Sequence, residues 1–355
     1  MELLALCSAG LEQAPCLELK RMGYKILKVT AGHVYFDAKL EDIPRLNISL
    51  YSVDRLLISV GRFEATTFDQ LFDGTYSLPW ENFVHKDAEL VVEKVKIRSS
   101  KLSATGAVAS VVKKAIYQKI NSSYQAAIKY PLYVYIKNNV VELALDTTGE
   151  NSLSRRGYRI KTSVAPLRET IAAALLLISG WDMKKLLVDP FCGSGTIPIE
   201  AARMALGILN NKREFAFQKW PMFSNFKLDE FERKIVKAKT VSMGFDIDET
   251  ILKVAKENAA RAGVLDFIRF EKKDFFKLDP FDQSVHVVTN PPYGLRIEGI
   301  DNKFYRNLAR FFVVFPHSTI CVITSKENLE KLFGKKPRKK FRFQNSGIWT
   351  WCYIF

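Results

Sequence analysis

Residues 186–202 place an apolar strand, a glycine-rich turn and a helix of small residues in direct succession. The strand ends near Asp189, and Gly193 and Gly195 follow within a few residues. Glycine permits the backbone conformations of a tight turn and lets a ligand approach the main chain. The N-terminus of the helix favours an anionic group, because its first N–H groups have no partner within the helix. We therefore expect an α/β domain with a ligand at the carboxyl ends of its strands.

A second buried strand ends in an unusual tetrapeptide about a hundred residues later. The apolar run 285–289 leads directly into Asn290, Pro291, Pro292 and Tyr293. Neither proline carries an N–H, so main-chain carbonyls and the Asn290 amide oxygen gather beside a flat ring. Such a site can accept hydrogen bonds from an NH2 group while the ring stacks on the base that carries it. For the tetrapeptide alone, a stiff Pro-Pro turn without chemistry is the alternative.

Together, the two motifs resemble the S-adenosylmethionine (SAM) site of class I methyltransferases that modify exocyclic amino groups of nucleic-acid bases. The resemblance implies a Rossmann-like α/β domain with a doubly wound, mostly parallel sheet of seven strands, the last of them antiparallel. It also implies which residues bind SAM: Pro166, Glu169, Asp189, Phe191, Gly193, Ser194, Gly195, Thr196, Asp246, Ile247, Asp274, Phe275 and Asn290. The catalytic residues would be Asn290, Pro291, Pro292 and Tyr293.

Two acidic residues after later strands are expected to hold the nucleoside part of SAM. An acid about twenty residues after the glycine-rich loop, as in dinucleotide-binding folds, is missing. Asp246 comes much later, after the polar and aromatic interval 203–240, which we interpret as a helical insertion of the kind that the resembling RNA methyltransferases carry. Asp246 would accept from the two ribose hydroxyls, although a surface turn is the alternative. Asp274 would accept from the adenine amino group, and Phe275 would cover the ring.

The first 158 residues predict two small α/β units. Residues 1–65 follow the order βαββαβ of a ferredoxin-like unit. Residues 66–158 contain a strand, a helix at about 105–120 and a hairpin whose turn is Asn138-Asn139, a good type I′ pair. The segments 6–12 and 153–159 match the ferredoxin-like plus THUMP arrangement of RNA-modifying enzymes, which implies that this part grips RNA. We therefore expect a ferredoxin-like domain at 1–65, a THUMP domain at 66–158 and the methyltransferase domain at 159–355.

Basic residues gather in three places that could contact RNA phosphates. A formal net charge of +15 permits a polyanionic partner without proving one. The expected contacts lie near the helix at 105–120, around Gly157 and in the run 334–342: Lys101, Lys113, Lys114, Arg155, Arg156, Arg159, Lys335, Lys336, Arg338, Lys339 and Lys340. Each group has a second interpretation. The lysines could form a solvated helix face, the arginines could join the two halves through carboxylates, and the late run could be a hairpin tip.

Cysteine usage and hydropathy exclude several classes of protein. The five cysteines are scattered, without a C-x-x-C pair or nearby histidines, which argues against a structural zinc site and a disulfide framework. The N-terminus lacks the basic and apolar regions of a signal peptide, and the apolar stretch 172–178 is too short to span a bilayer. We expect a cytoplasmic protein without a metal, a membrane partner or an obligate protein partner.

The resemblance implies transfer of the SAM methyl group to an exocyclic amine in RNA, with guanine N2 of 23S rRNA as the favoured target. The Asn290 oxygen and the Pro291 carbonyl would hold both N–H protons of the amine, and Tyr293 would stack on the extruded base. A tRNA guanine-N2 methyltransferase is the second candidate. The third is an adenine-N6 DNA methylase, in which Asn-Pro-Pro-Tyr also occurs, and the fourth is a non-catalytic RNA-binding protein.

Overall fold

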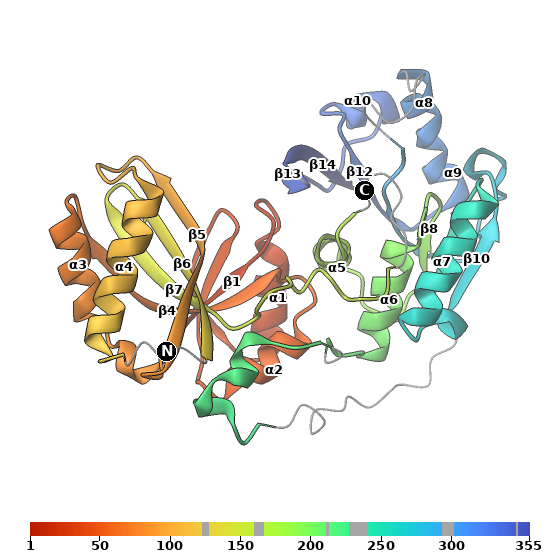
Figure 1. Ribbon diagram of the computed structural model, residues 1–355. Coiled ribbons are helices and arrows are strands. Elements are labelled where there is room, and N and C mark those ends of the chain that lie inside the picture. Colours follow the sequence, from red (N-terminus) through yellow and green to blue (C-terminus); the bar gives the residue numbers. More distant parts are fainter. Residues whose placement is uncertain (123–127, 160–166, 211–212, 227–239, 293–301, 346) are drawn as a thin grey trace.

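The computed structural model of the chain describes residues 1–122, 128–159, 167–210, 213–226, 240–292, 302–345 and 347–355. Its amino-terminal half consists of one sheet with helices packed on it (Figure 1). The strands are β1 (Glu2–Leu6), β2 (Lys25–Thr30), β3 (His33–Asp37), β4 (Arg55–Glu64), β5 (Ala88–Arg98), β6 (Ile128–Lys137) and β7 (Val140–Asp146). The helices are α1 (Gln13–Arg21), α2 (Asp42–Ser49), α3 (Phe68–Ser77) and α4 (Thr105–Lys119), with a 3-10 turn at Trp80–Asn82.

The amino-terminal sheet has the strand order β2-β3-β1-β4-β7-β6-β5. Strand β4 runs to Glu64, because its second half pairs antiparallel with β7 past an irregularity between Ser59 and Gly61. The ferredoxin-like strands and the THUMP strands therefore form one continuous sheet. In the β6–β7 hairpin, Asn138 and Asn139 both have positive φ, 53° and 63°, as the type I′ turn predicted from the sequence requires.

The carboxyl-terminal half is built on a second seven-stranded sheet. Its strands are β8 (Leu187–Asp189), β9 (Ser242–Asp246), β10 (Ile268–Lys272), β11 (His286–Thr289), β12 (Thr319–Thr324), β13 (Lys339–Asn345) and β14 (Ile348–Ile354). The helices are α5 (Glu169–Ile178), α6 (Thr196–Leu206), α7 (Glu249–Arg261), α8 (Asn302–Asn307), α9 (Phe311–Val314) and α10 (Leu329–Phe333). Short 3-10 turns lie at Ala216–Lys219, Pro221–Phe223, Leu265–Phe267, Phe275–Lys277 and Leu308–Arg310.

This second sheet confirms the fold class predicted from the sequence. Its order is β10-β9-β8-β11-β12-β14-β13, with parallel pairs from β10 to β12 and an antiparallel β14. Helices α5, α6 and α7 share one hydrophobic core with residues of the sheet such as Val288, and residues of α8, α9 and α10 share another with Val287. Because successive side chains of a strand point to opposite faces, both faces of the sheet are covered. The parallel strands therefore end together at one edge.

Two segments of interest lie partly outside the described residues. Helix α5 begins at Glu169, and Pro166, which was expected to bind SAM, is not among the residues that the structure describes. The interval after α6 was expected to be helical, but its described part forms only two short 3-10 turns. The reason lies in its aromatic residues, which are buried in the core of the amino-terminal half: Phe215, Phe217, Trp220 and Phe223.

Residues 213–226, which we call the aromatic strap, attach the carboxyl-terminal half to the amino-terminal sheet (Figure 1, green). The Trp220 ring stacks on Tyr130 with 4.7 Å between ring centroids. Its indole Nε1 donates a hydrogen bond to the main-chain oxygen of Lys129 at 3.1 Å. The Phe217 amide donates to the Thr147 oxygen at 3.2 Å. A linear division of the chain at residue 158 therefore does not describe this packing.

Arg156 forms a second connection between the halves, and its side chain is buried. The guanidinium donates to the main-chain oxygens of Tyr51 at 2.5 Å and Leu153 at 2.8 Å. Its Nε lies 3.5 Å from a carboxylate oxygen of Glu200 in α6. Arg156 thus joins the two halves, which was one of the two interpretations left open by the sequence. Its expected contact with RNA was wrong, because the buried side chain is not accessible.

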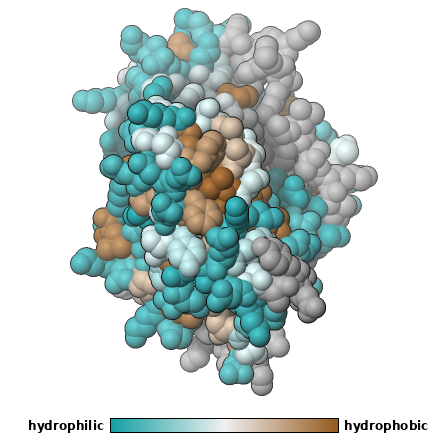
Figure 2. All heavy atoms as spheres, turned by 60° about the vertical axis from the view of Figure 1, so that its left-hand side comes forward, coloured by the Kyte–Doolittle hydropathy of each residue, from teal (hydrophilic) through white to brown (hydrophobic). Residues whose placement is uncertain are grey.

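The most apolar helix of the described residues, α5, lies in the interior of the protein. It has ten residues, and all of them are buried in the core. Within the described part of the chain, no helix is both long and apolar enough to cross a bilayer. The face shown in Figure 2 is mostly hydrophilic, with a limited hydrophobic patch near its middle.

Replacing Trp220 by alanine tests the aromatic strap. The change removes a fully buried ring and its hydrogen bond, so we expect the free energy of unfolding to fall by about 3–5 kcal/mol. Trp349→Ala is the control, because Trp349 is 46% exposed on β14, and a surface change of this kind costs about 0.5 kcal/mol or less. Urea unfolding followed by fluorescence and circular dichroism measures both. If both variants lose the same free energy of unfolding, the strap does not stabilise the protein in the way described.

Candidate active site

A cavity of about 650 Å³ lies at the carboxyl ends of β8, β9, β10 and β11. Its described lining consists of Pro190, Phe191, Gly193, Asp246, Ile247, Lys273, Asp274, Phe275, Phe276, Asn290, Pro291, Pro292 and Phe304. These residues come from five separate segments of the chain, and the parallel sheet brings the segments together. Most of them were candidates from the sequence. Pro190, Lys273, Phe276 and Phe304 were not.

The glycine-rich loop between β8 and α6 needs its glycines for two different reasons. Gly193 and Gly195 have φ values of 51° and 84°, in the left-handed region that other residues avoid. A β-carbon at residue 195 would also lie 3.1 Å from Ala255 Cβ and from the Phe270 ring. The loop can therefore pass close to α7 and β10 and still leave its outer side toward the cavity. Ser194 and Thr196 were expected in the site, but they are buried and do not line the cavity.

Asp246 ends β9, and its position confirms the second strand of the predicted sheet. Its Oδ2 accepts a hydrogen bond from the Gly193 amide at 3.0 Å, and its Oδ1 accepts from the Asp248 amide at 3.0 Å. The carboxylate is thus fixed against the glycine-rich loop. Each carboxylate oxygen can accept more than one hydrogen bond, so Asp246 can still accept from a ligand in the cavity.

The segment after β10 supplies a carboxylate and two aromatic rings. Asp274 caps a 3-10 turn, because its Oδ1 accepts from the Phe276 amide at 3.0 Å. Phe275 is buried and lies 5.1 Å from the Phe191 ring, centroid to centroid. Phe276 meets Phe304 of α8 edge to face at 5.8 Å. Phe191 and Phe275 therefore form one aromatic wall of the cavity, and Phe276 and Phe304 form a second.

Asn290 is the polar residue of the cavity whose acceptor is open. Its Oδ1 is buried, and no described residue donates a hydrogen bond to it. A buried acceptor without a partner costs about 1–3 kcal/mol, so such an atom indicates a place for a donor on a ligand. The neighbouring Pro291 and Pro292 also line the cavity. Tyr293, the predicted stacking residue, lies outside the described residues.

Asp189 lies behind the glycine-rich loop and not in the cavity lining. It is almost fully buried, and its Oδ1 accepts from the Thr289 hydroxyl at 2.7 Å and from the Phe191 amide at 3.2 Å. Burial raises the pKa of Asp189 to about 7, and the two hydrogen bonds only partly oppose this shift. The side chain connects the ends of β8 and β11. This geometry gives it a supporting position beneath the site.

Arg159 was expected to contact RNA, but its contacts lie inside the carboxyl-terminal half. Its guanidinium donates to the Thr196 hydroxyl at 2.9 Å and to the main-chain oxygen of Leu167. Its Nε lies 3.2 Å from Glu169 Oε1. Burial raises the pKa of Glu169, and Arg159 opposes this shift. Arg159 and Glu169 join the start of α5 to the start of α6. Neither residue belongs to the described lining of the cavity.

The other basic residues that were expected to contact RNA differ in whether their side chains are already bonded within the protein. Arg338 donates to the Phe355 oxygen at 2.9 Å, and Lys340 lies 2.9 Å from a Glu330 oxygen. Lys339 is bonded to Gln13 of α1. These three side chains hold the carboxyl-terminal hairpin in place. The remaining candidates are exposed or half-buried and stay predictions as RNA contacts: Lys101, Lys113, Lys114, Arg155, Lys335 and Lys336.

The cavity fits the nucleoside part of SAM. A ribose can donate to Asp246 at the end of β9, and an adenine amino group can donate to Asp274. An adenine ring needs flat apolar walls, which Phe191 and Phe275 supply. Within the described residues, no cluster of His, Cys, Asp or Glu is placed to hold a metal ion.

The raised pKa of Asp189 makes stability depend on pH. The folded protein holds this proton up to about pH 7, whereas the unfolded chain releases it near pH 3.8. The free energy of unfolding should therefore fall as pH rises through this interval, by at most about 1.4 kcal/mol per pH unit for this group. Asp189→Asn keeps the Oδ1 acceptor and cannot titrate. Urea unfolding at pH 5 to 8 should show the variant gaining stability relative to the natural protein. A constant difference would exclude this titration.

Three family models match consecutive parts of the chain. The model described as "RMKL-like, methyltransferase domain" matches residues 156–350. The RlmL ferredoxin-like domain matches residues 2–57, and the THUMP domain matches residues 65–146.

Curated relatives are about 31% identical to this chain over the aligned residues. "Putative RNA methyltransferase YpsC" of Bacillus subtilis is 31% identical over 99% of this chain and 95% of that protein. "Ribosomal RNA large subunit methyltransferase K/L" of Vibrio cholerae is 31% identical over 97% of this chain, which spans only 52% of that relative. "tRNA (guanine(6)-N2)-methyltransferase" of Methanocaldococcus jannaschii is 31% identical over 82% of this chain and 80% of that protein.

Solved structures share the whole architecture. "A possible methylase from Clostridium difficile" has a TM-score of 0.91 and 34% identity, covering 100% of this chain and 97% of that one. "A predicted N6-adenine-specific DNA methylase from Listeria monocytogenes" has a TM-score of 0.88 and 35% identity, covering 100% and 95%. "SMU.472, a putative methyltransferase complexed with SAH" has a TM-score of 0.88 and 30% identity, covering 100% and 97%.

The methyltransferase model covers more than half of the chain, and its relatives align over nearly all of it. Family membership and the fit of the cavity confirm the expected cofactor, SAM. The chain belongs to the RMKL-like methyltransferase family and combines that domain with an RlmL-type ferredoxin-like domain and a THUMP domain.

Proposed function

We propose that this protein methylates an exocyclic amino group of a base in RNA, with guanine N2 of 23S rRNA as the favoured target and a tRNA guanine as the second. The observation that carries the proposal is the buried Oδ1 of Asn290 in the wall of the cavity, to which no described residue donates a hydrogen bond. SAM supplies the electrophilic methyl group, and the residues of the chain position the amine that receives it.

The chemistry of the cavity wall suits an amine better than other nucleophiles. An exocyclic amine carries two N–H donors, and its lone pair is delocalised into the base. The Asn290 oxygen and the Pro291 carbonyl can accept one N–H each, which favours a pyramidal nitrogen with its lone pair turned toward the donor. Pro291 and Pro292 have no N–H, so neither of these two residues offers a main-chain donor to a carbonyl oxygen. Fixing the reacting nitrogen in this way supplies most of the rate through orientation.

Aromatic residues at the outer wall suit an extruded base. A base inside a helix cannot reach a cavity at the strand ends and has to leave its stack. Phe276 and Phe304 line the cavity beside the proline pair and form a surface on which a planar base can lie. Tyr293 follows the same strand end and remains a second candidate for this contact.

RNA is favoured as the substrate class by the amino-terminal half. The THUMP domain and the ribosomal RNA and tRNA enzymes among the relatives support RNA. The tRNA relative is named for guanine N2, which supports guanine as the base. The Listeria structure named for adenine-N6 in DNA supports the rival, and Asn290 would serve an adenine amine equally well. Substrate assays therefore have to decide between the two bases.

Methylation assays with labelled SAM test the substrate directly. The purified protein is incubated with 23S rRNA, tRNA and DNA from cells that lack the gene, and the products are digested to nucleosides. We expect N2-methylguanosine from 23S rRNA, identified by mass spectrometry. N2-methylguanosine from tRNA alone would move the proposal to its second target. N6-methyldeoxyadenosine from DNA, without methylated RNA, would overturn it.

Asp246→Ala should weaken SAM binding without changing RNA binding. Loss of two charge-assisted hydrogen bonds to the ribose costs about 1–3 kcal/mol, which corresponds to a roughly 5- to 150-fold higher Kd. Asp282→Ala is the control, because Asp282 is an exposed carboxylate outside the cavity lining. Calorimetric titration with SAM measures both variants. Unchanged SAM affinity in a folded Asp246→Ala protein would remove Asp246 from the cofactor site.

Asn290→Ala should slow methyl transfer while the protein still binds SAM and RNA. Removing one preorganised polar group at a reacting atom costs on the order of 100-fold in rate. Single-turnover rates, measured beside melting temperatures, separate this effect from lost stability. If Asn290 only shapes a rigid turn, activity will fall in step with the melting temperature, and a folded variant with the natural transfer rate would take the catalytic role from this residue.

A further inference from the structure

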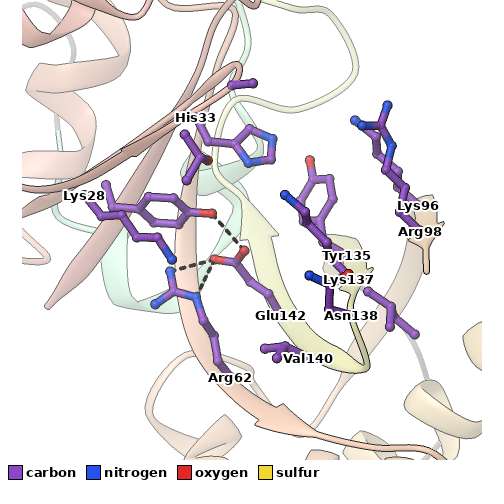
Figure 3. A pocket seen from close by; sticks show the side chains of 14 residues that line it. Lys28, His33, Arg62, Lys96, Arg98, Tyr135, Lys137, Asn138, Val140 and Glu142 are labelled. Carbon is purple, nitrogen blue, oxygen red and sulfur yellow. Dashed lines mark hydrogen bonds and ion pairs between the residues drawn. The ribbon is translucent and has the colours of Figure 1, made fainter. Parts of the chain in front are cut away.

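A second cavity, of about 370 Å³, lies on the amino-terminal sheet and has no part in the site described above (Figure 3). Helices α2, α3 and α4 pack on the face of this sheet that carries Leu132 and Val134. The cavity opens on the opposite face, where β6 presents Tyr135 and Lys137. Its walls come from β2 and β3 of the ferredoxin-like unit and from β5, β6 and β7 of the THUMP unit, with β4 between them.

The sheet is rolled around this cavity. His33 on β3 and Tyr135 on β6 are separated by four strand spacings in the sheet order, which would be about 19 Å in a flat sheet. Their rings nevertheless lie 5.1 Å apart, centroid to centroid. The two edges of the sheet therefore curve toward each other, as in an incomplete barrel. Side chains from both units reach into the same space, and Figure 3 shows them converging.

Positive charge in the cavity exceeds negative charge. Five cationic side chains line it: Lys28, Arg62, Lys96, Arg98 and Lys137. The lining carboxylate, Glu142, is already engaged, because Arg62 Nη2 lies at 2.8 Å and the Tyr35 hydroxyl donates to it at 2.9 Å. Across the described chain, no carboxylate forms an ion pair with the other four cations. An anion would therefore find free positive partners here.

The pKa values of two groups agree with this excess of positive charge. Burial lowers the pKa of Lys96, and Arg98 and Lys94 lower it further. Burial lowers the pKa of His33 to about 4, and Lys96 and Lys94 add to the shift. His33 is therefore neutral at pH 7 and presents an uncharged aromatic ring. That ring lies beside Tyr35, at 6.2 Å, and Tyr135, so the cavity has an aromatic side as well as a cationic rim.

We infer that this cavity binds one nucleotide of a single-stranded segment of the RNA substrate. The phosphate lies against Lys96 and Arg98, and the base lies against the rings of His33 and Tyr135. A simple anion would not need the aromatic side, and an apolar ligand would not need the cations. The volume lies at the small end of the range for ligand sites and suits a single unstacked nucleotide. The inference rests on the RNA substrate proposed above.

A charge-reversal pair with a matched control tests the cavity. Lys96→Glu with Arg98→Glu changes the rim, whereas Lys253→Glu with Lys256→Glu makes a matching change of charge at two exposed lysines of α7, in the other half of the protein. Binding of a fluorescein-labelled single-stranded RNA of five nucleotides is measured by anisotropy without SAM. We expect the rim pair to weaken RNA binding at least tenfold. The slope of log K against log salt should also become shallower, by the amount that corresponds to the loss of about one to two phosphate contacts. The α7 pair should stay within about twofold.

The opposite ranking, with the α7 pair weakened and the rim pair unchanged, would overturn the inference. Circular dichroism of both variants verifies that they are folded. A second measurement avoids substitutions: the same RNA carrying 4-thiouridine is cross-linked to the natural protein, and the attached peptides are sequenced. Cross-links at His33 or Tyr135 support the cavity, and cross-links confined to α4 or to the carboxyl-terminal half contradict it.

The tests of this cavity and of the catalytic proposal have separate outcomes. If the rim pair loses RNA binding but the natural protein methylates no RNA, the cavity stands and the proposed function fails. If RNA is methylated while the rim pair binds and reacts like the natural protein, the proposed function stands and the cavity fails.

Discussion

The buried Arg156 guanidinium is one of the contacts that set the relative placement of the two halves. A charged group away from water is tolerated only when it is paired and hydrogen-bonded. Arg156 meets this requirement with Glu200 on one side and the main-chain oxygens of Tyr51 and Leu153 on the other. Arg203 also approaches Glu200, at 3.5 Å, and bonds Asn210. Loss of one partner would leave a buried charge uncompensated, so the cluster fixes the geometry of the contact between the halves.

In the carboxyl-terminal half, the polar residues at the strand ends differ in how firmly they are held. Asp246 is fixed by main-chain donors, and Asp189 is enclosed beneath the glycine-rich loop, so both carboxylates have settled positions. Asn290 differs, because its oxygen is enclosed without a described donor. The same sheet edge therefore presents two fixed carboxylates and one open acceptor, an arrangement that agrees with the proposed binding of a cofactor and of a reacting amine.

Local patterns predicted the parts of this molecule that are determined locally. The strand and glycine-rich loop near Asp189 and the Asn138-Asn139 turn follow from short stretches of sequence, whereas the seven-stranded sheet with an antiparallel last strand was implied by the family resemblance. The roles of Arg156 and Arg159 could not be predicted, because the sequence does not show which carboxylate faces an arginine after folding. Phe304 was missed for a similar reason: it comes from α8 and reaches the cavity only through the fold. The aromatic interval 203–240 was interpreted as helical, since its pattern does not reveal that its partner surface lies in the other half of the chain.

The continuous ladder from β2 to β5 has a consequence for attempts to produce parts of this protein separately. Strand β4 belongs to both units, because it pairs with β1 on one side and with β7 on the other. A fragment that stops after β4 would expose one row of its N–H and C=O groups, and a fragment that starts after β4 would expose the matching row on β7. Free strand edges of this kind recruit other chains. Either fragment would be prone to aggregate, so the smallest amino-terminal piece suited to expression contains both units and the aromatic strap that covers them.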